Sequence, residues 1–137
     1  MILGINHVGL AVRSIDEIVS RLETLFGARE LGRESYPELG QTSSIVQVGD
    51  SLLELMEPIG EAGVIPKFLA EHGQGLHHIS LLSDDADRDR ARIAASGARV
   101  LGSLEGDLRV IFTHPKDSGG VIYEITDVPY PRTTEGS

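Results

Sequence analysis

The sequence contains no cysteine, and few of its 137 residues are basic. Without cysteine the chain can form no disulfide, no thiolate metal site and no cysteine nucleophile, and this composition fits the reducing cytoplasm, where we expect the protein. No apolar run approaches the length of a membrane span, and the first residues lack a basic region, so we expect neither a membrane segment nor a signal peptide. The chain has 12 basic and 21 acidic residues, and the resulting net charge of −9 makes nucleic acid a poor partner.

Several catalytic motifs are missing as well. The sequence has no Gly-x-Ser-x-Gly elbow, no phosphate-binding loop and no dinucleotide fingerprint. Hydrophobic residues make up 40% of the chain, which is enough to bury a core. The length fits one domain, or two small modules that share one core.

What the chain does contain is an internal repeat. The segment Ile5–Leu10 returns as Leu76–Leu81, and Leu52–Leu55 returns as Ile122–Ile125. Each copy carries one histidine near its start and one glutamate near its end. We therefore expect a single domain with module one at residues 2–57, a joint at 58–75, module two at 76–127 and a frayed tail at 128–137.

Side-chain periodicity predicts one strand, one helix and three more strands in each copy. Ser14, with Glu17 three residues later, forms a capping box, and an apolar stripe then continues to Gly27. The corresponding helix of module two is expected to start at Ser83 or Asp84. The predicted strands are 4–12, 29–34, 43–48, 52–56, 76–82, 98–102, 108–113 and 121–126, and the predicted helices are 14–26, 65–72 and 84–96.

This order predicts an α+β fold. Two tandem βαβββ modules would form a curled, mostly antiparallel sheet, with one helix covering one face in each module. The uncovered faces would enclose a cavity between the two copies, which is a natural ligand site.

Two histidines and two glutamates at duplicate positions suggest the chemistry of that cavity. Strand alternation places His7 on a face with small residues and Glu54 between leucines, where a buried carboxylate without a partner is costly. A metal ion would compensate the two glutamates, and so would an arginine or a lysine. The register with His7 selects His78 rather than His77. Imidazole and carboxylate suit Co²⁺, Mn²⁺, Ni²⁺, Zn²⁺ or Fe²⁺, so we predict metal ligation by His7, Glu54, His78 and Glu124.

The other histidines and the basic residues have weaker signals. We expect His72 to face water at a helix end and His114 to shape a turn before a proline. An anionic ligand would need a local basic spot, for which Lys67, Arg109 and Lys116 are available.

Five stretches of the sequence carry a family resemblance, namely residues 5–12, 48–58, 65–69, 75–79 and 112–124. In these stretches the chain resembles the vicinal-oxygen-chelate superfamily, which includes glyoxalase I, extradiol dioxygenases and antibiotic-resistance proteins. Within it the sequence is most similar to the branch of the methylmalonyl-CoA epimerases. The pair His77-His78 and the run His114-Pro115-Lys116 are typical of that branch.

The resemblance implies a divalent metal bound by His7, His78 and Glu124, with Glu54 at the fourth ligand position. It implies an isomerase that inverts the α-carbon of (2R)/(2S)-methylmalonyl-CoA through a metal-stabilised enolate, with Glu124 as a catalytic acid or base. Some members of the family place a glutamate where this chain has Ser43. We expect Ser43 and Lys116 to contact the acyl-CoA substrate, and we expect a homodimer, because members of this superfamily often pair modules between chains.

Two other functions share parts of this pattern. One is a glyoxalase-like lyase or isomerase that acts on a hemithioacetal with the same metal site. The other is a non-catalytic module whose cavity binds a small molecule.

Overall fold

The computed structural model describes residues 1–130, which form two compact units. The first unit consists of Met1–His7 and residues 78–130, and the second unit consists of Val8–His77. Strand β1 (Ile2–Ala11) runs from the first unit into the second. One boundary between the units therefore falls within β1, directly after His7, and the other falls within β5 (Gly75–Ser83), directly before His78. Neither boundary lies in the predicted joint at residues 58–75.

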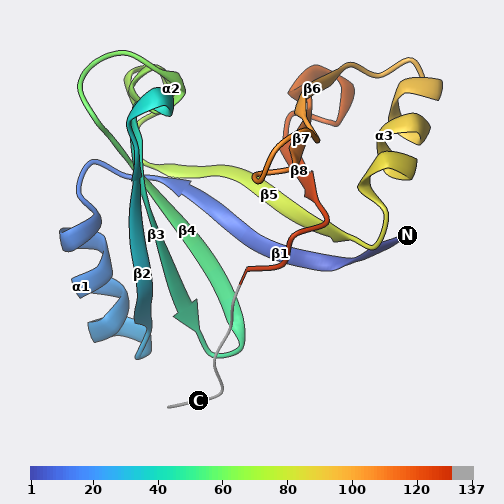
Figure 1. The fold of residues 1–137 in the computed structure, drawn as a ribbon. Helices are drawn as coiled ribbons and strands as arrows, with labels where there is room; N and C mark the ends of the chain where they lie inside the picture. The colour runs from blue at the N-terminus through green and yellow to red at the C-terminus, as the bar shows by residue number, and fades with distance from the viewer. Residues whose placement is uncertain (131–137) are drawn as a thin grey trace. The chain divides into compact units, whose positions relative to one another are not determined.

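The second unit contains the end of β1, followed by α1 (Ile15–Phe26), β2 (Arg29–Tyr36), the 3₁₀ helix η1 (Pro37–Leu39), β3 (Gln41–Val48), β4 (Ser51–Pro58) and α2 (Val64–His72). Its strands lie in the order β2-β3-β4-β1 (Figure 1). The β1–β4 pair is parallel, whereas the pairs β2–β3 and β3–β4 are antiparallel.

Helix α1 confirms Ser14 as the N-cap and Gly27 as the stop. The Ser14 hydroxyl accepts a hydrogen bond of 3.2 Å from the Glu17 backbone N–H, and Gly27 ends the helix in the left-handed conformation, with φ of 67°. Ile15 and Val19 lie on the stripe that faces the sheet. The core of this unit also contains Val12, Ala28, Val46 and Leu55.

Helix α2 packs on the opposite face of β4 from α1. Ile65 and Leu69 of α2 form a small core with Ala11 and Met56. Because side chains alternate along a strand, Met56 shares its face with Glu54. Helix α2 therefore covers the side of the unit on which Glu54 lies.

The first unit contains the N-terminal part of β1, most of β5 (Gly75–Ser83), α3 (Ala86–Ala95), β6 (Val100–Ser103), β7 (Val110–Thr113), the 3₁₀ helix η2 (Pro115–Asp117) and β8 (Ile122–Thr126). Its strands lie in the order β1-β5-β8-β7-β6. The β5–β8 pair is parallel, and β6–β7 and β7–β8 are antiparallel. In each unit the parallel pair thus joins the first and the last strand of one repeat.

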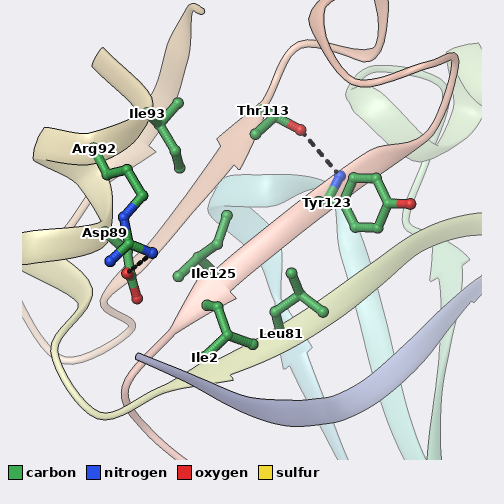
Figure 2. Close-up of a pocket in the computed structure, with 8 residues that line it drawn as sticks. All are labelled: Ile2, Leu81, Asp89, Arg92, Ile93, Thr113, Tyr123 and Ile125. Atoms are coloured by element: carbon green, nitrogen blue, oxygen red, sulfur yellow. Dashed lines mark hydrogen bonds and ion pairs between the residues drawn. The ribbon is translucent and has the colours of Figure 1, made fainter. Parts of the chain in front are cut away.

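Helix α3 covers one face of this second set of strands. Ala86 and the partly buried Ile93 pack against Ile111 and Ile125. Beside them Ile93, Ile125 and Leu81 line a pocket of about 280 Å³ between the helix and the sheet (Figure 2). The helix and the sheet therefore leave a mostly apolar hollow beside the core of this unit.

The start of α3 differs from the prediction. The N-cap is Asp85, whose carboxylate accepts a 3.0 Å hydrogen bond from the Arg88 backbone N–H, and not Ser83 or Asp84. The Ser83 hydroxyl instead donates to the buried carboxylate of Asp89 and accepts from the Asp85 backbone N–H. Ser83 thus ties the strand end to the first turns of the helix.

Asp85 should therefore carry the stabilising effect of this cap. We expect Asp85→Ala to lower the free energy of unfolding by about 1 kcal/mol, the usual value for an N-cap carboxylate. The exposed loop residue Asp107 provides the control, and Asp107→Ala should leave the stability unchanged. Urea denaturation measures both variants, and equal midpoints for the two would contradict the assignment of the cap.

Most other element predictions are confirmed. All eight predicted strands and all three predicted helices occur, and the fold class is α+β with a βαβββ order in each half. The segment between β2 and β3 contains the short helix η1. Of the tail predicted at 128–137, residues 131–137 lie outside the described part of the chain. Within the described residues, no helix has the combination of length and apolar character that a membrane crossing needs.

Candidate metal centre

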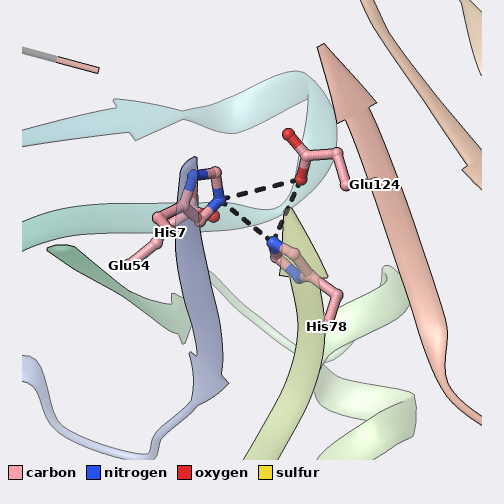
Figure 3. Close-up of side chains that lie close together, drawn as sticks. All are labelled: His7, Glu54, His78 and Glu124. Atoms are coloured by element: carbon pink, nitrogen blue, oxygen red, sulfur yellow. Dashed lines mark hydrogen bonds and ion pairs between the residues drawn. The ribbon is translucent and has the colours of Figure 1, made fainter. Parts of the chain in front are cut away.

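Three predicted ligands meet in the first unit (Figure 3). His78 Nε2 lies 3.0 Å from Glu124 Oε2 and 3.2 Å from His7 Nε2. His7 Nε2 lies 3.8 Å from Glu124 Oε2. The three side chains come from β1, β5 and β8 and point their ligand atoms at one another.

The strand register brings these side chains to one face of the sheet. In the parallel β5–β8 pair, His78 lies opposite Ile122 and Ser80 lies opposite Glu124. His78 and Ser80 are two residues apart, so they share a face with Glu124. β1 is the next strand beyond β5 and contributes His7. The predicted choice of His78 over His77 thus agrees with the direction of these side chains.

The three candidate ligands are almost completely buried. His7 is 1% exposed, His78 4% and Glu124 5%. A buried carboxylate needs a positive partner, because removing its charge from water is costly. A protonated imidazole beside Glu124 would be such a partner. The alternative is a bound cation, toward which both neutral imidazoles direct a lone pair.

The spacing of the ligand atoms fits a divalent ion. A ligand distance of about 2.1 Å separates two ligand atoms by about 3.0 Å at a right angle and about 3.4 Å at the tetrahedral angle. The separations of 3.0 and 3.2 Å lie within this range, and the separation of 3.8 Å corresponds to a wider angle at the ion. Ser80, the cross-strand neighbour of Glu124, has a buried hydroxyl without a hydrogen-bond partner among the described residues. A buried polar atom of this kind is rare in folded proteins, so a polar ligand fits at this face. The residues therefore suit a metal ion of the predicted kind.

Glu54 belongs to the second unit. It lies on β4, is 8% exposed, and pairs with Gly9 of β1 and Ile45 of β3. Burial, together with a hydrogen bond to Glu34 and the nearby carboxylates, Glu54 among them, raises the pKa of the Tyr36 phenol. Glu54 is thus a buried acid, as the alternation along its strand predicted.

The two predicted substrate contacts lie on other elements. Ser43 is buried on β3, and its hydroxyl accepts a 3.1 Å hydrogen bond from the Gln41 side chain. Lys116 is exposed in the 3₁₀ helix η2, where its backbone N–H donates to His114 Nδ1. Neither residue belongs to the cluster of His7, His78 and Glu124.

The other histidines do not belong to this cluster. His77 packs its ring against Phe68, with centroids 4.9 Å apart. His72 is mostly exposed at the end of α2, and His114 caps the turn at η2, which confirms both predictions.

Of the basic residues offered for an anionic ligand, Arg109 is already engaged. Its guanidinium binds the carboxylates of Asp127 and Asp87 and the backbone carbonyl of Leu104. The hydrogen bond to Asp127, above all, raises the pKa of Arg109. Arg109 therefore ties a loop to the rest of its unit.

Three residues near the cluster escaped the sequence reasoning. Ser80 could have been found, because it alternates with His78 along the strand. Asn6 precedes His7, so alternation assigns it to the other face, and Tyr130 lies in the segment interpreted as a frayed tail. Nevertheless, Asn6 Nδ2 lies 3.2 Å from His7 Nδ1, and the ring of Tyr130 stacks on that of His7.

Comparisons with known proteins show the family to which the chain belongs. The sequence pattern of the Glyoxalase/Bleomycin resistance protein/Dioxygenase superfamily matches residues 6–112. The chain belongs to this superfamily. This member is 33% identical to the ethylmalonyl-CoA/methylmalonyl-CoA epimerase of Cereibacter sphaeroides over 93% of its own length and all of that protein. It thus resembles an isomerase along nearly its whole sequence.

Solved structures give the same relationship. A Streptomyces coelicolor methylmalonyl-CoA epimerase variant in complex with 2-nitronate-propionyl-CoA has a TM-score of 0.84 and 32% identity, covering 91% of this chain and 96% of that one. A methylmalonyl-CoA epimerase in complex with methylmalonyl-CoA and NH₄⁺ has a TM-score of 0.81 and 32% identity, covering 91% and 94%. Both of these structural neighbours are methylmalonyl-CoA epimerases, as is the Cereibacter sphaeroides relative.

Proposed function

We propose that this protein is a metal-dependent epimerase that interconverts (2R)- and (2S)-methylmalonyl-CoA. The observation that carries the proposal is the convergence of His7, His78 and Glu124 in a chain that resembles such epimerases along nearly all of its sequence. The substrate class follows from the names of these relatives and from the acyl-CoA ligands of the solved neighbours.

The metal site of the proposal consists of His7, His78, Glu124 and Glu54. A divalent ion held there would act as a Lewis acid that stabilises negative charge on the oxygen atoms of an enolate. The two imidazoles and the carboxylate suit Co²⁺, Mn²⁺, Ni²⁺, Zn²⁺ or Fe²⁺.

Glu124 is the proposed base. The α-hydrogen of the substrate lies between a thioester and a carboxylate and is therefore acidic for a carbon-bound hydrogen. The carboxylate of Glu124 takes this proton, and the electron pair of the broken C–H bond moves into the thioester carbonyl. A second acidic group on the opposite face of the planar carbon then donates a proton. The electron pair returns from the enolate oxygen to form the C–H bond with inverted configuration, and Glu124 releases its proton to solvent.

Glu54 is the proposed fourth ligand because it is the duplicate of Glu124 in the sequence repeat. If it binds the ion, Glu54→Gln should weaken Co²⁺ binding by at least about tenfold, since even partners behind the ligands contribute about 10–100-fold. Isothermal titration calorimetry measures this, with the half-buried Glu57→Gln as control. Affinity equal to that of the wild type in both variants would remove Glu54 from the ligand set.

Ser43 and Lys116 are the proposed substrate contacts. The exposed ammonium of Lys116 suits an anionic part of an acyl-CoA, and the hydroxyl of Ser43 can bind an oxygen atom. If so, Lys116→Ala should raise KM more than it lowers kcat, and an unchanged KM would remove Lys116 from this role.

We also propose a cytoplasmic homodimer. Leu3 and Ile5 of β1 expose 59% and 58% of their surfaces, which supports pairing with a second copy. The proposed substrate is a CoA thioester, a class of metabolite used inside cells. Sedimentation velocity tests the dimer, and cell fractionation tests the location.

Proton exchange tests the reaction itself. In D₂O the α-proton of methylmalonyl-CoA should wash out in the presence of protein and Co²⁺, as followed by ¹H NMR. No exchange with any of the five metals would reject the proposal. Conversion of methylglyoxal with a thiol under the same conditions would instead indicate a glyoxalase-like enzyme.

A further inference from the structure

Tyr130 makes close contact with one of the candidate metal ligands. Its ring is stacked on the imidazole of His7, with centroids 4.2 Å apart and planes inclined by only 5°. Both residues belong to the first unit, and they lie at opposite ends of the described chain. Parallel stacking at this distance holds the plane of the imidazole, because rotation of the ring would lose the contact.

A second contact connects the same two residues. The backbone N–H of Tyr130 donates a 3.2 Å hydrogen bond to Asn6 Oδ1, and Asn6 Nδ2 lies 3.2 Å from His7 Nδ1. Asn6 is 2% exposed, and its carboxamide contacts Tyr130 on one side and His7 on the other. The side chain of Asn6 thus connects the end of the described chain with the edge of the His7 imidazole.

These contacts act on the atoms of His7 that do not face the other ligands. Nε2 is directed at His78 and Glu124, while Nδ1 faces Asn6 and the ring face is covered by Tyr130. The orientation of a ligating imidazole depends on the group at its second nitrogen and on packing against its ring. Tyr130 therefore touches His7 where a positioning group must act.

We propose that Tyr130 is a positioning residue of the metal centre, which orients His7 by stacking on its ring. The inference rests on the proposed metal site. It extends the working site to the segment that follows β8, beyond the strands that carry the ligands.

The test compares Tyr130→Ala with Tyr130→Phe and Tyr130→Trp in the full chain. Removal of the ring should lower the affinity for Co²⁺ by about tenfold, the lower end for groups behind a metal ligand. It should also change the visible absorption bands of bound Co²⁺, which report ligand geometry. The aromatic variants keep the stack and should restore both. Val128→Ala, in the same segment, should behave as wild type.

Two additional readouts separate positioning from general stability. Thermal unfolding of metal-free protein should be nearly the same for Tyr130→Ala and Val128→Ala. The chain has no tryptophan, so the indole in Tyr130→Trp is a unique fluorophore, and its emission should change when Co²⁺ is added.

The outcomes are distinct. Wild-type affinity and an unchanged Co²⁺ spectrum in Tyr130→Ala would overturn the inference and leave the proposed function standing. A Co²⁺ affinity that is as low in Tyr130→Phe and Tyr130→Trp as in Tyr130→Ala would also overturn the inference. Wild-type protein that binds Co²⁺ with the expected Tyr130 dependence but exchanges no substrate proton would support the inference and reject the epimerase proposal.

Discussion

His78→Ala is expected to abolish metal binding and activity. The variant loses the atom that lies closest to both other ligands, at 3.0 Å from Glu124 Oε2 and 3.2 Å from His7 Nε2. Groups that only support a ligand contribute about 10–100-fold to metal affinity, so loss of a ligand itself should cost more than about 100-fold. Exchange of the α-proton should fall by at least about 1000-fold, because the charge on the enolate is then uncompensated.

The adjacent histidine provides a matched control. His77→Ala removes an identical side chain from the next position of β5, but this ring packs on Phe68. We expect its metal affinity and exchange rate to stay within a few-fold of the wild type, at some cost in stability from the lost packing. Calorimetric titration with Co²⁺ and ¹H NMR in D₂O measure both variants. Comparable loss in the two would contradict a role specific to His78.

Glu124→Gln should remove the reaction even when the metal site is filled. The amide oxygen of glutamine can still approach the ion, but an amide cannot accept the α-proton at neutral pH. General acid–base groups contribute about 10²–10⁴-fold, and Glu124 also binds the ion, so we expect exchange to fall by at least about 1000-fold. The measurement is the exchange rate as a function of Co²⁺ concentration, up to saturation.

Saturation with metal separates the two roles of Glu124. If excess Co²⁺ restores exchange to the wild-type rate, Glu124 is a ligand only, and the base must be another group. Glu105→Gln serves as the control, since Glu105 is an exposed loop residue of the same unit. Its exchange rate should match that of the wild type at every metal concentration.

The N-caps of helices α1 and α3 differ in how well the local sequence predicts them. At α1 only Ser14 stands at the correct distance before the apolar stripe, and it is the cap. Before α3 the residues Ser83, Asp84 and Asp85 are all good caps, so propensity alone cannot choose among them. The hydroxyl of Ser83 donates a hydrogen bond to the buried carboxylate of Asp89. This contact connects the strand with the helix, and Asp85 is the N-cap.

The candidate ligands were accessible from the sequence because strand geometry is regular. A period of two decides which side chains share a face, and the repeat indicates which histidine and which glutamate correspond. Both signals are local or periodic. They therefore identified His7, His78, Glu54 and Glu124 and separated His78 from His77.

The surroundings of His7 were decided only by the tertiary structure. Asn6 and Tyr130 are 124 residues apart, and no local pattern reports a contact between such distant positions. Tyr130 lies in a polar segment with prolines, which by composition favours fraying. In the folded chain, the stack on His7 and the hydrogen bond to Asn6 offset the entropy lost when this segment is ordered, and those partners exist only after β1 has paired in the sheet.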